Sequence, residues 1–159
     1  MKIAATIASC LVAVSLAAQS ADLVVLEKSK RTLYLYQNGH MLKSYKVALG
    51  SHPVGPKTQA GDGRTPEGRY TIDFRQRNSH YHRSLHVSYP NESDRRNARR
   101  RGVSPGGEIF IHGLPNGMGA LGKAHRLRDW TLGCIAVTDE EIEEIWRLVP
   151  NRTPIEIRP

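Results

Sequence analysis

The segment DWTLGC, residues 129–134, carries Cys134 and lies downstream of a second segment, IFIHG, residues 109–113, that carries His112. The sequence holds two cysteines, and the other one, Cys10, falls in an apolar stretch at the N-terminus. If that stretch is removed during export, one thiol remains without a partner for an internal disulfide. Because exported proteins usually pair their cysteines or avoid them, the isolated thiol is a candidate nucleophile. His112 is the candidate base that would activate it.

The immediate surroundings of Cys134 suit this chemistry. A cysteine attacks as its thiolate, so a neighbouring imidazole or a group of N–H donors must favour the anion. Gly133 allows a close backbone approach and unusual torsion angles, which would turn the N–H groups of Gly133 and Cys134 toward an oxyanion. Three other interpretations stay open on the residues alone: an inert buried thiol, a disulfide-linked dimer, or a metal site of Cys134, His112 and His125.

The first 20 residues are typical of a secretory signal peptide. Met1 and Lys2 form a short basic start, residues 3–18 are apolar or small, and small residues near position 20 predict cleavage at about 20/21. A membrane anchor and lipidation of Cys10 are alternatives, but the run is short for a spanning helix and continues past Cys10. We therefore expect a signal peptide at 1–20 and one globular domain at 21–159, exported to the periplasm or cell wall without stable membrane insertion.

The charge balance indicates the class of partner. The chain has a formal net charge of +8, with 39% hydrophobic and 24% charged residues. A basic exported protein is attracted to anionic surfaces such as wall polymers or lipid head groups. No zinc-finger, RNA-recognition or helix-turn-helix pattern supports nucleic acid as a partner. One basic run is expected to be a solvated face, with contact to an anionic wall polymer as the alternative: Arg95, Arg96, Arg99, Arg100 and Arg101.

Short β-rich segments separated by turn residues predict a mainly β domain. The expected strands are residues 23–26, 32–36, 43–49, 69–74, 84–88, 109–111 and 154–157. A loop dense in Gly, Pro and charge is expected at 50–68, and loops of this length are usually functional or mobile. A short capped helix is expected at 93–102. One main helix is expected after Cys134, where Thr138 and Glu141 form a capping box before apolar residues with helical spacing.

The spacing of these motifs resembles a known family. Residues 111–113 (IHG) followed by 131–134 (TLGC) resemble the active-site signature of the L,D-transpeptidase catalytic domain (the YkuD-like, or ErfK/YbiS/YcfS/YnhG, family). Residues 61–70 (GDGRTPEGRY) resemble its Thr-Pro-x-Gly loop, and the likeness extends over roughly residues 23–159. It implies a β-sandwich or barrel of mixed strands with one main helix after the cysteine.

The resemblance also implies an activity. Cys134 would attack a peptidoglycan stem tetrapeptide, release D-Ala and form a thioacyl-enzyme, which then passes its acyl group to a neighbouring stem as a 3→3 cross-link. His112 would serve as general base and acid, and backbone N–H groups around Gly133 and Cys134 would form the oxyanion hole. No metal or organic cofactor is implied.

The chain departs from the family pattern beside the cysteine. Relatives often carry His where this sequence has Leu132, so His125 is the candidate to replace that imidazole. Asp129 is expected either to orient a histidine or to cap a turn. The remaining candidate supporting residues are Gly113, Trp130 and Thr131. Two rival functions stay open: an L,D-carboxypeptidase or related hydrolase at the same site, and a non-catalytic wall-binding module.

Overall fold

The computed structural model describes residues 19–159, so Cys10 and nearly all of the predicted signal peptide, residues 1–20, lie outside the described residues. The strands are β1 (Leu23–Glu27), β2 (Thr32–Gln37), β3 (His40–Lys46), β4 (Gly68–Ser79), β5 (His82–Val87), β6 (Ile109–His112), β7 (Ile135–Ala136) and β8 (Pro154–Arg158). The helices are α1 (Glu92–Arg100), the 3-10 helix η1 (Gly119–Leu127) and α2 (Asp139–Leu148). No helix in the described range is long and apolar enough to cross a membrane.

The strands form one curled, mixed sheet in the order β3-β2-β1-β8-β4-β5-β6-β7. The first three strands are an antiparallel meander, as are β4, β5 and β6. The C-terminal strand β8 joins the two groups, because Ile155 pairs with Val24 of β1 on one side and with Tyr70 of β4 on the other. The prediction of a mainly β fold of mixed strands is therefore confirmed.

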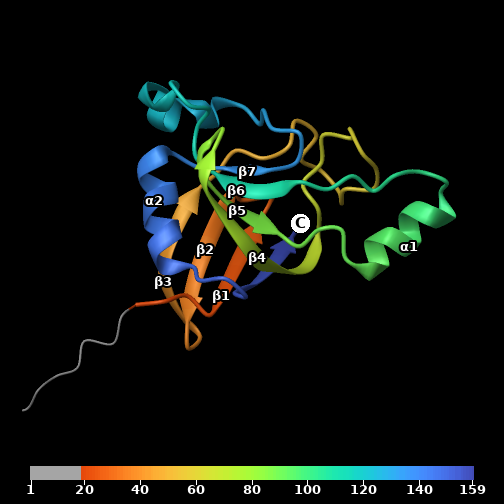
Figure 1. Cartoon of the computed structure of the whole chain (residues 1–159), viewed down its shortest axis with the longest axis horizontal. Coiled ribbons are helices and arrows are strands. Elements are labelled where there is room, and N and C mark those ends of the chain that lie inside the picture. The colour runs from red at the N-terminus through yellow and green to blue at the C-terminus, as the bar shows by residue number, and fades with distance from the viewer. Residues whose placement is uncertain (1–18) are drawn as a thin grey trace, which may run out of the picture.

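Helix α2 packs against β5 and also reaches β3, where the Tyr45 hydroxyl donates to Glu144 (Figure 1), so that the sheet and the helix enclose a core. Ile72, Leu85, Ile111 and Ile135 point into this core and have no exposed surface, and Ile142 of α2 is equally buried. Successive strand residues point to opposite faces. The residues between these apolar ones are therefore left on the outer face, where the candidate site lies.

Helix α2 begins where the sequence predicted it. The Thr138 side chain accepts a hydrogen bond from the Glu141 N–H at 3.3 Å, and the Glu141 carboxylate accepts one from the Thr138 N–H at 2.9 Å. This capping box pairs two groups that a helix start otherwise leaves unsatisfied. The helix therefore starts at a defined residue, Asp139, five positions after Cys134.

Three local expectations need correction. β3 ends at Lys46, because residues 47–50 leave the β2 edge and bridge to the site loop at Ala136 and Thr131. Helix α1 is capped by Asn91 and begins at Glu92, since the Asn91 side chain accepts the Asp94 N–H at 3.0 Å. The sequence reading also missed β7 and η1; η1 contains a kink at a glycine and lacks a continuous helical period.

The loop at residues 50–68 packs against the segment that precedes Cys134. The Ser51 N–H donates to the Thr131 carbonyl at 2.9 Å, and the Gly50 N–H donates to Thr65 Oγ1 at 3.1 Å. In Figure 1 this orange-to-yellow loop lies beside the blue segment that leads to β7. Two segments far apart in sequence thus form the wall around Cys134.

Candidate functional site

His112 at the end of β6 and Cys134 directly before β7 face the same side of the sheet. β6 and β7 run parallel with Ile111 opposite Ile135, so Cys134 lies beside Phe110, two residues before His112. Both side chains line one cleft of about 770 Å³. The fold therefore brings together the two residues that the sequence separated by 22 positions.

The thiol of Cys134 is half-buried and uncharged at rest. It donates a hydrogen bond to the Glu108 carbonyl at 3.4 Å. Burial raises the pKa of this thiol above its usual range, and the backbone N–H of Phe110 offsets part of that effect. Because a buried thiolate is costly without a strong partner, the raised pKa favours the protonated thiol.

The turn that presents Cys134 is held by Thr131. Its hydroxyl donates to the Cys134 carbonyl at 2.8 Å and accepts the Gly133 N–H at 3.1 Å. Gly133 has φ +136°, and a Cβ there would lie 2.6 Å from the Arg64 carbonyl oxygen. Only glycine fits this position without displacing the neighbouring loop. Since the Gly133 N–H is engaged by Thr131, Gly133 shapes the turn rather than offering a free donor.

His112 is only 3% exposed although it faces the cleft. Its Nδ1 lies 2.7 Å from the Gly113 carbonyl, which can only accept, so Nδ1 carries the proton and Nε2 is the basic nitrogen. Burial lowers the pKa of His112 to about 4, and the hydrogen bond to Gly113 opposes this shift. The imidazole is therefore neutral near pH 7 and ready to accept a proton at Nε2.

Gly113 contributes space as well as its carbonyl. A Cβ at this position would lie 2.7 Å from Asp139 Oδ1 and 3.0 Å from Ile142 Cγ2. Because β6 ends against the start of α2 here, a larger residue would push His112 away from its position. Gly113 is thus a positioning residue for the imidazole.

Two aromatic rings enclose His112. The Tyr81 ring lies 4.4 Å from the imidazole and the Trp130 ring lies 5.9 Å from it, measured between ring centroids. The sequence singled out Trp130 but not Tyr81, which lies in the turn between β4 and β5 and carries no motif. Its role follows only from the hairpin that folds it over β6.

His125 lies behind Trp130 rather than among the side chains that line the cleft. Its Nδ1 accepts the Trp130 indole N–H at 3.4 Å, and it is 7% exposed. Burial and the neighbouring Arg126 lower the pKa of His125. It therefore supports the Trp130 ring, and its proximity also contributes to the lowered pKa of His112.

Asp129 connects the site loop to the strands of the other half of the sheet. Its carboxylate accepts the Leu49 N–H at 2.9 Å and pairs with the Arg31 guanidinium at 2.8 Å. Of the two expectations for Asp129, orienting a histidine or capping a turn, neither describes these contacts. The carboxylate clamps the segment that follows β3 against the segment that precedes Cys134.

A buried cation that the sequence reading missed also lines the cleft. The Lys57 side chain is 3% exposed and pairs with Asp62 at 2.8 Å. Although burial alone would raise it, hydrogen bonds from Lys57 and from backbone N–H groups lower the pKa of Asp62 to about 2. Lys57 is attractive to the Cys134 thiolate and lowers the pKa of that thiol somewhat. Its only sequence signal was its place in the long 50–68 loop.

Leu132, where relatives often carry His, is 79% exposed at the rim of the cleft. The turn therefore directs this side chain outward, away from the position of a buried thiolate partner. Within residues 19–159, no group of three His, Cys, Asp or Glu side chains is arranged to hold a metal ion.

Relatives share this architecture. YafK of Escherichia coli K12, which its name assigns only provisionally to the L,D-transpeptidases, is 30% identical over 128 residues, covering 77% of this chain and 44% of YafK. The structure of Pgp2, the helical cell shape determining protein of Campylobacter jejuni, covers 87% of this chain and 48% of Pgp2 at 23% identity, with a TM-score of 0.66. An L,D-transpeptidase from Mycobacterium smegmatis covers 87% of this chain and 59% of its own at 14% identity, with a TM-score of 0.57.

The two structural similarities show a common fold, and the chain spans less than half of YafK and of Pgp2. The family model for the L,D-transpeptidase catalytic domain, YkuD, matches residues 21–157. This match takes in every strand and helix that positions Cys134 and His112 except the last residue of β8. The chain therefore belongs to the L,D-transpeptidase catalytic domain family.

Proposed function

We propose that the protein is a peptidoglycan L,D-transpeptidase, a cysteine acyltransferase in which Cys134 is the nucleophile and His112 the general base. The observation that carries the proposal is the shared cleft, which is lined by a half-buried thiol directly before β7 and by an imidazole at the end of β6 whose Nε2 is the basic nitrogen. The donor is a stem tetrapeptide, and the bond cleaved joins its third residue to the terminal D-Ala.

The first half-reaction forms the thioacyl-enzyme. The Cys134 proton moves to His112 Nε2 as sulfur attacks the carbonyl carbon, and the new S–C bond gives a tetrahedral intermediate. When the C–N bond breaks, His112 returns the proton to the departing D-Ala amine. The neutral pair at rest suits this order, because the charge appears only once substrate has displaced water.

The second half-reaction transfers the acyl group. An amine of a neighbouring stem attacks the thioester carbonyl, and His112 Nε2 removes its proton. Collapse of the intermediate breaks the S–C bond, and the proton returns from His112 to the Cys134 sulfur. The product is a 3→3 cross-link and the enzyme is restored.

The Cys134 N–H is the proposed oxyanion donor. The Gly133 N–H is occupied by Thr131, whereas the Cys134 N–H makes no hydrogen bond to another group within residues 19–159. A backbone N–H adjacent to the nucleophile is well placed to face the oxygen of the tetrahedral intermediate. The rigid turn held by Thr131 keeps this donor oriented before substrate binds.

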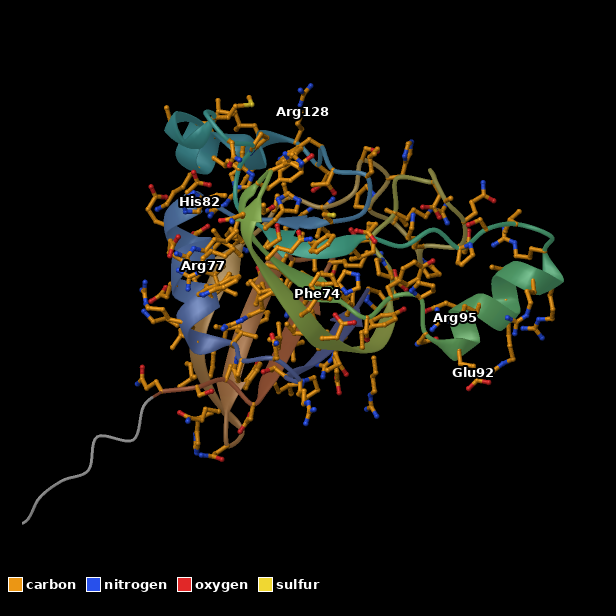
Figure 2. The ribbon with its side chains drawn as sticks, viewed as in Figure 1. Phe74, Arg77, His82, Glu92, Arg95 and Arg128 are labelled. Atoms are coloured by element: carbon orange, nitrogen blue, oxygen red, sulfur yellow. The ribbon has the colours of Figure 1, made fainter. Side chains whose placement is uncertain are left out.

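Export and wall contact complete the proposal. A signal peptide at residues 1–20 would place the enzyme in the periplasm or cell wall, where its substrate lies. Helix α1 projects from the domain (Figure 1), its arginines are exposed, and Figure 2 shows Arg95 on it. This basic helix is a candidate contact for an anionic wall polymer. The candidate contact residues are four arginines of α1 and the residue that follows its end: Arg95, Arg96, Arg99, Arg100 and Arg101.

The test is incubation of the mature protein with tetrapeptide muropeptides, followed by mass spectrometry. A cross-linked dimer that lacks one D-Ala supports transpeptidation, and a tripeptide monomer supports the L,D-carboxypeptidase alternative. Cys134→Ala is the matched control and should give neither product while retaining its fold. If the wild-type protein forms no product and no thioacyl or carbapenem adduct at Cys134, the enzymatic proposal is wrong and the wall-binding alternative gains support.

A further inference from the structure

We propose that an aromatic platform on β4–β6, formed by Phe74, His86 and Phe110, binds the glycan sugar that carries the donor stem peptide. This inference rests on the proposed function and extends it from the peptide to the glycan strand. The platform lies on the same outer face as Cys134 and His112 but outside the residues used for the chemistry.

The Phe74 ring is held in a defined orientation. It stacks on the His86 imidazole with centroids 4.3 Å apart and planes 17° apart, and it meets the Phe110 ring edge-on at 5.9 Å. His86 is fixed in turn by a contact of 2.6 Å between its Nδ1 and Asp73 Oδ1. Phe74 nevertheless remains 40% exposed, which is unusual for a ring with this much support. The arrangement leaves one aromatic face presented to solvent.

The platform continues directly from the cleft. Phe110 belongs to both, since it lines the cleft and also contacts Phe74 and His86. His86 pairs with Phe110 across β5 and β6, and Phe74 extends the row to β4. Figure 2 shows Phe74 over the sheet, well separated from Glu92 and Arg95 on α1. A ligand anchored at Cys134 can thus cross β6 and β5 to reach Phe74.

The length of the donor stem peptide matches the distance from Cys134 to Phe74. Adjacent strands lie about 4.8 Å apart, so β4 is roughly 14 Å from the strand that follows Cys134. Three extended residues, from the scissile carbonyl back to the start of the stem, span about 10 Å. The lactyl group that joins the stem to its sugar adds a few more bonds. With its acyl carbon at Cys134, the donor would therefore place its sugar close to Phe74.

The chemistry around Phe74 suits a carbohydrate. The apolar C–H face of a pyranose packs on an exposed aromatic ring, while its hydroxyls need polar partners at the ring edge. Asp73, Gln76 and Asn78 are exposed along the same strand, and Gln76 and Asn78 also line the cleft. A purely apolar partner lying over Gln76 and Asn78 would cover these amides without hydrogen-bonding to them. A sugar can pack its apolar face on the ring and form hydrogen bonds with the polar side chains beside it.

The experiment compares two donors that differ only in the sugar: a disaccharide-tetrapeptide and the free tetrapeptide. D-Ala release is measured for wild type, for Phe74→Ala, for Phe74→Tyr and for Met41→Ala. Met41 is a matched control because it is 58% exposed on β3, outside the cleft. We expect wild type to prefer the glycan-bearing donor, and Phe74→Ala to lose about three- to tenfold in kcat/KM with that donor alone. Phe74→Tyr should retain the preference, and Met41→Ala should resemble wild type.

Equal losses on both donors, or no loss on either, would overturn the proposal, because the ring would then contact the peptide or nothing. A binding measurement separates this outcome from failure of the proposed function. Calorimetric titration of the Cys134→Ala protein with each donor requires no turnover. Tighter binding of the disaccharide-tetrapeptide that is lost in Cys134→Ala/Phe74→Ala supports the platform even if D-Ala is not released. Equal affinity for both donors rejects it.

Discussion

The two faces of β6 differ in what their side chains do, although they alternate along four consecutive residues. Ile111 packs into the core with no exposed surface, and Ile109, which is 2% exposed, packs there while its side chain also reaches the wall of the cleft. Phe110 and His112 line the cleft from the opposite face of the strand. His112 is nevertheless 3% exposed, because Tyr81 and Trp130 cover it from the solvent side. The comparison shows that a residue on the functional face can be as desolvated as one in the core.

This difference has an electrostatic consequence. Removal from water stabilises a buried isoleucine, but an imidazole loses the water that would stabilise its charged form. Burial therefore keeps His112 neutral, and the Gly113 carbonyl determines which nitrogen is basic. One strand thus supplies packing on one face and a tuned base on the other.

The largest expected effect comes from removing the base on the outer face. His112→Gln should lower kcat/KM by about 10²–10⁴, the usual contribution of general acid–base catalysis. The glutamine amide can still donate to the Gly113 carbonyl, so the melting temperature should change little. Kinetics with tetrapeptide and differential scanning calorimetry provide the two readouts. A variant that keeps its activity would remove His112 from the proposed mechanism.

The matched change on the inner face should affect stability instead. Ile111→Ala removes a fully buried side chain and should lower the free energy of unfolding by about 2–5 kcal/mol. Because Ile111 points away from the cleft, the folded fraction should retain most of its rate constant for D-Ala release. Denaturant unfolding and active-site titration test this together. A large loss of rate in fully folded protein would show that the two faces are not separable.

The pH dependence of stability tests whether His112 is as desolvated as the core residues of β6. The pKa of His112 falls from 6.5 to about 4 on folding, so the unfolded chain binds a proton between these values and the folded protein does not. The contribution of the neutral imidazole to the free energy of unfolding is therefore complete above pH 6.5. About 3 kcal/mol of this contribution is lost as the pH falls toward 4. Denaturant unfolding of wild type and His112→Gln across this range should show a steeper loss for wild type. Parallel curves would mean that His112 is not desolvated in solution.

The smallest expected effect concerns His125. Because it contacts Trp130 and does not line the cleft, His125→Ala should lower the rate of thioacyl formation by less than tenfold, through a less restrained Trp130 ring. His125→Asn can retain an acceptor for the indole N–H and should recover part of that loss. Stopped-flow measurement of carbapenem acylation tests both. A loss of about 10² or more, not explained by unfolding, would make His125 the replacement for the imidazole that relatives carry at the position of Leu132.

Local sequence patterns were enough to predict much of the fold. The strands near the N-terminus, the capping box of α2 and the strand that carries His112 could be predicted because each depends on neighbouring residues or on alternation within one segment. η1 and β7 were not predictable in this way. η1 has a kink at Gly122, and β7 is two residues long and exists only because β6 lies beside it.

The residues of the candidate site also fall into those that the sequence predicted and those that only the fold revealed. Cys134 and His112 were found from residue chemistry and motif resemblance, both of which are properties of short segments. Tyr81, Lys57 and the actual partners of Asp129 were not, since Tyr81 contacts His112, Lys57 acts on Cys134 and Asp129 pairs with Arg31, all of which lie far apart in the sequence. A side chain with no local motif gains its role only from the neighbours that the fold supplies.

The sequence by itself determined the family, the mainly β architecture and the identity of the candidate nucleophile and base, because those depend on residue types and short-range spacing. The tertiary structure alone decided that His112 is buried and neutral, that Thr131 engages the Gly133 N–H, and that His125 lies behind Trp130. It also decided that an exposed aromatic ring continues the cleft toward β4. Desolvation, hydrogen-bond competition and the continuity of a surface all arise between segments that only folding brings together.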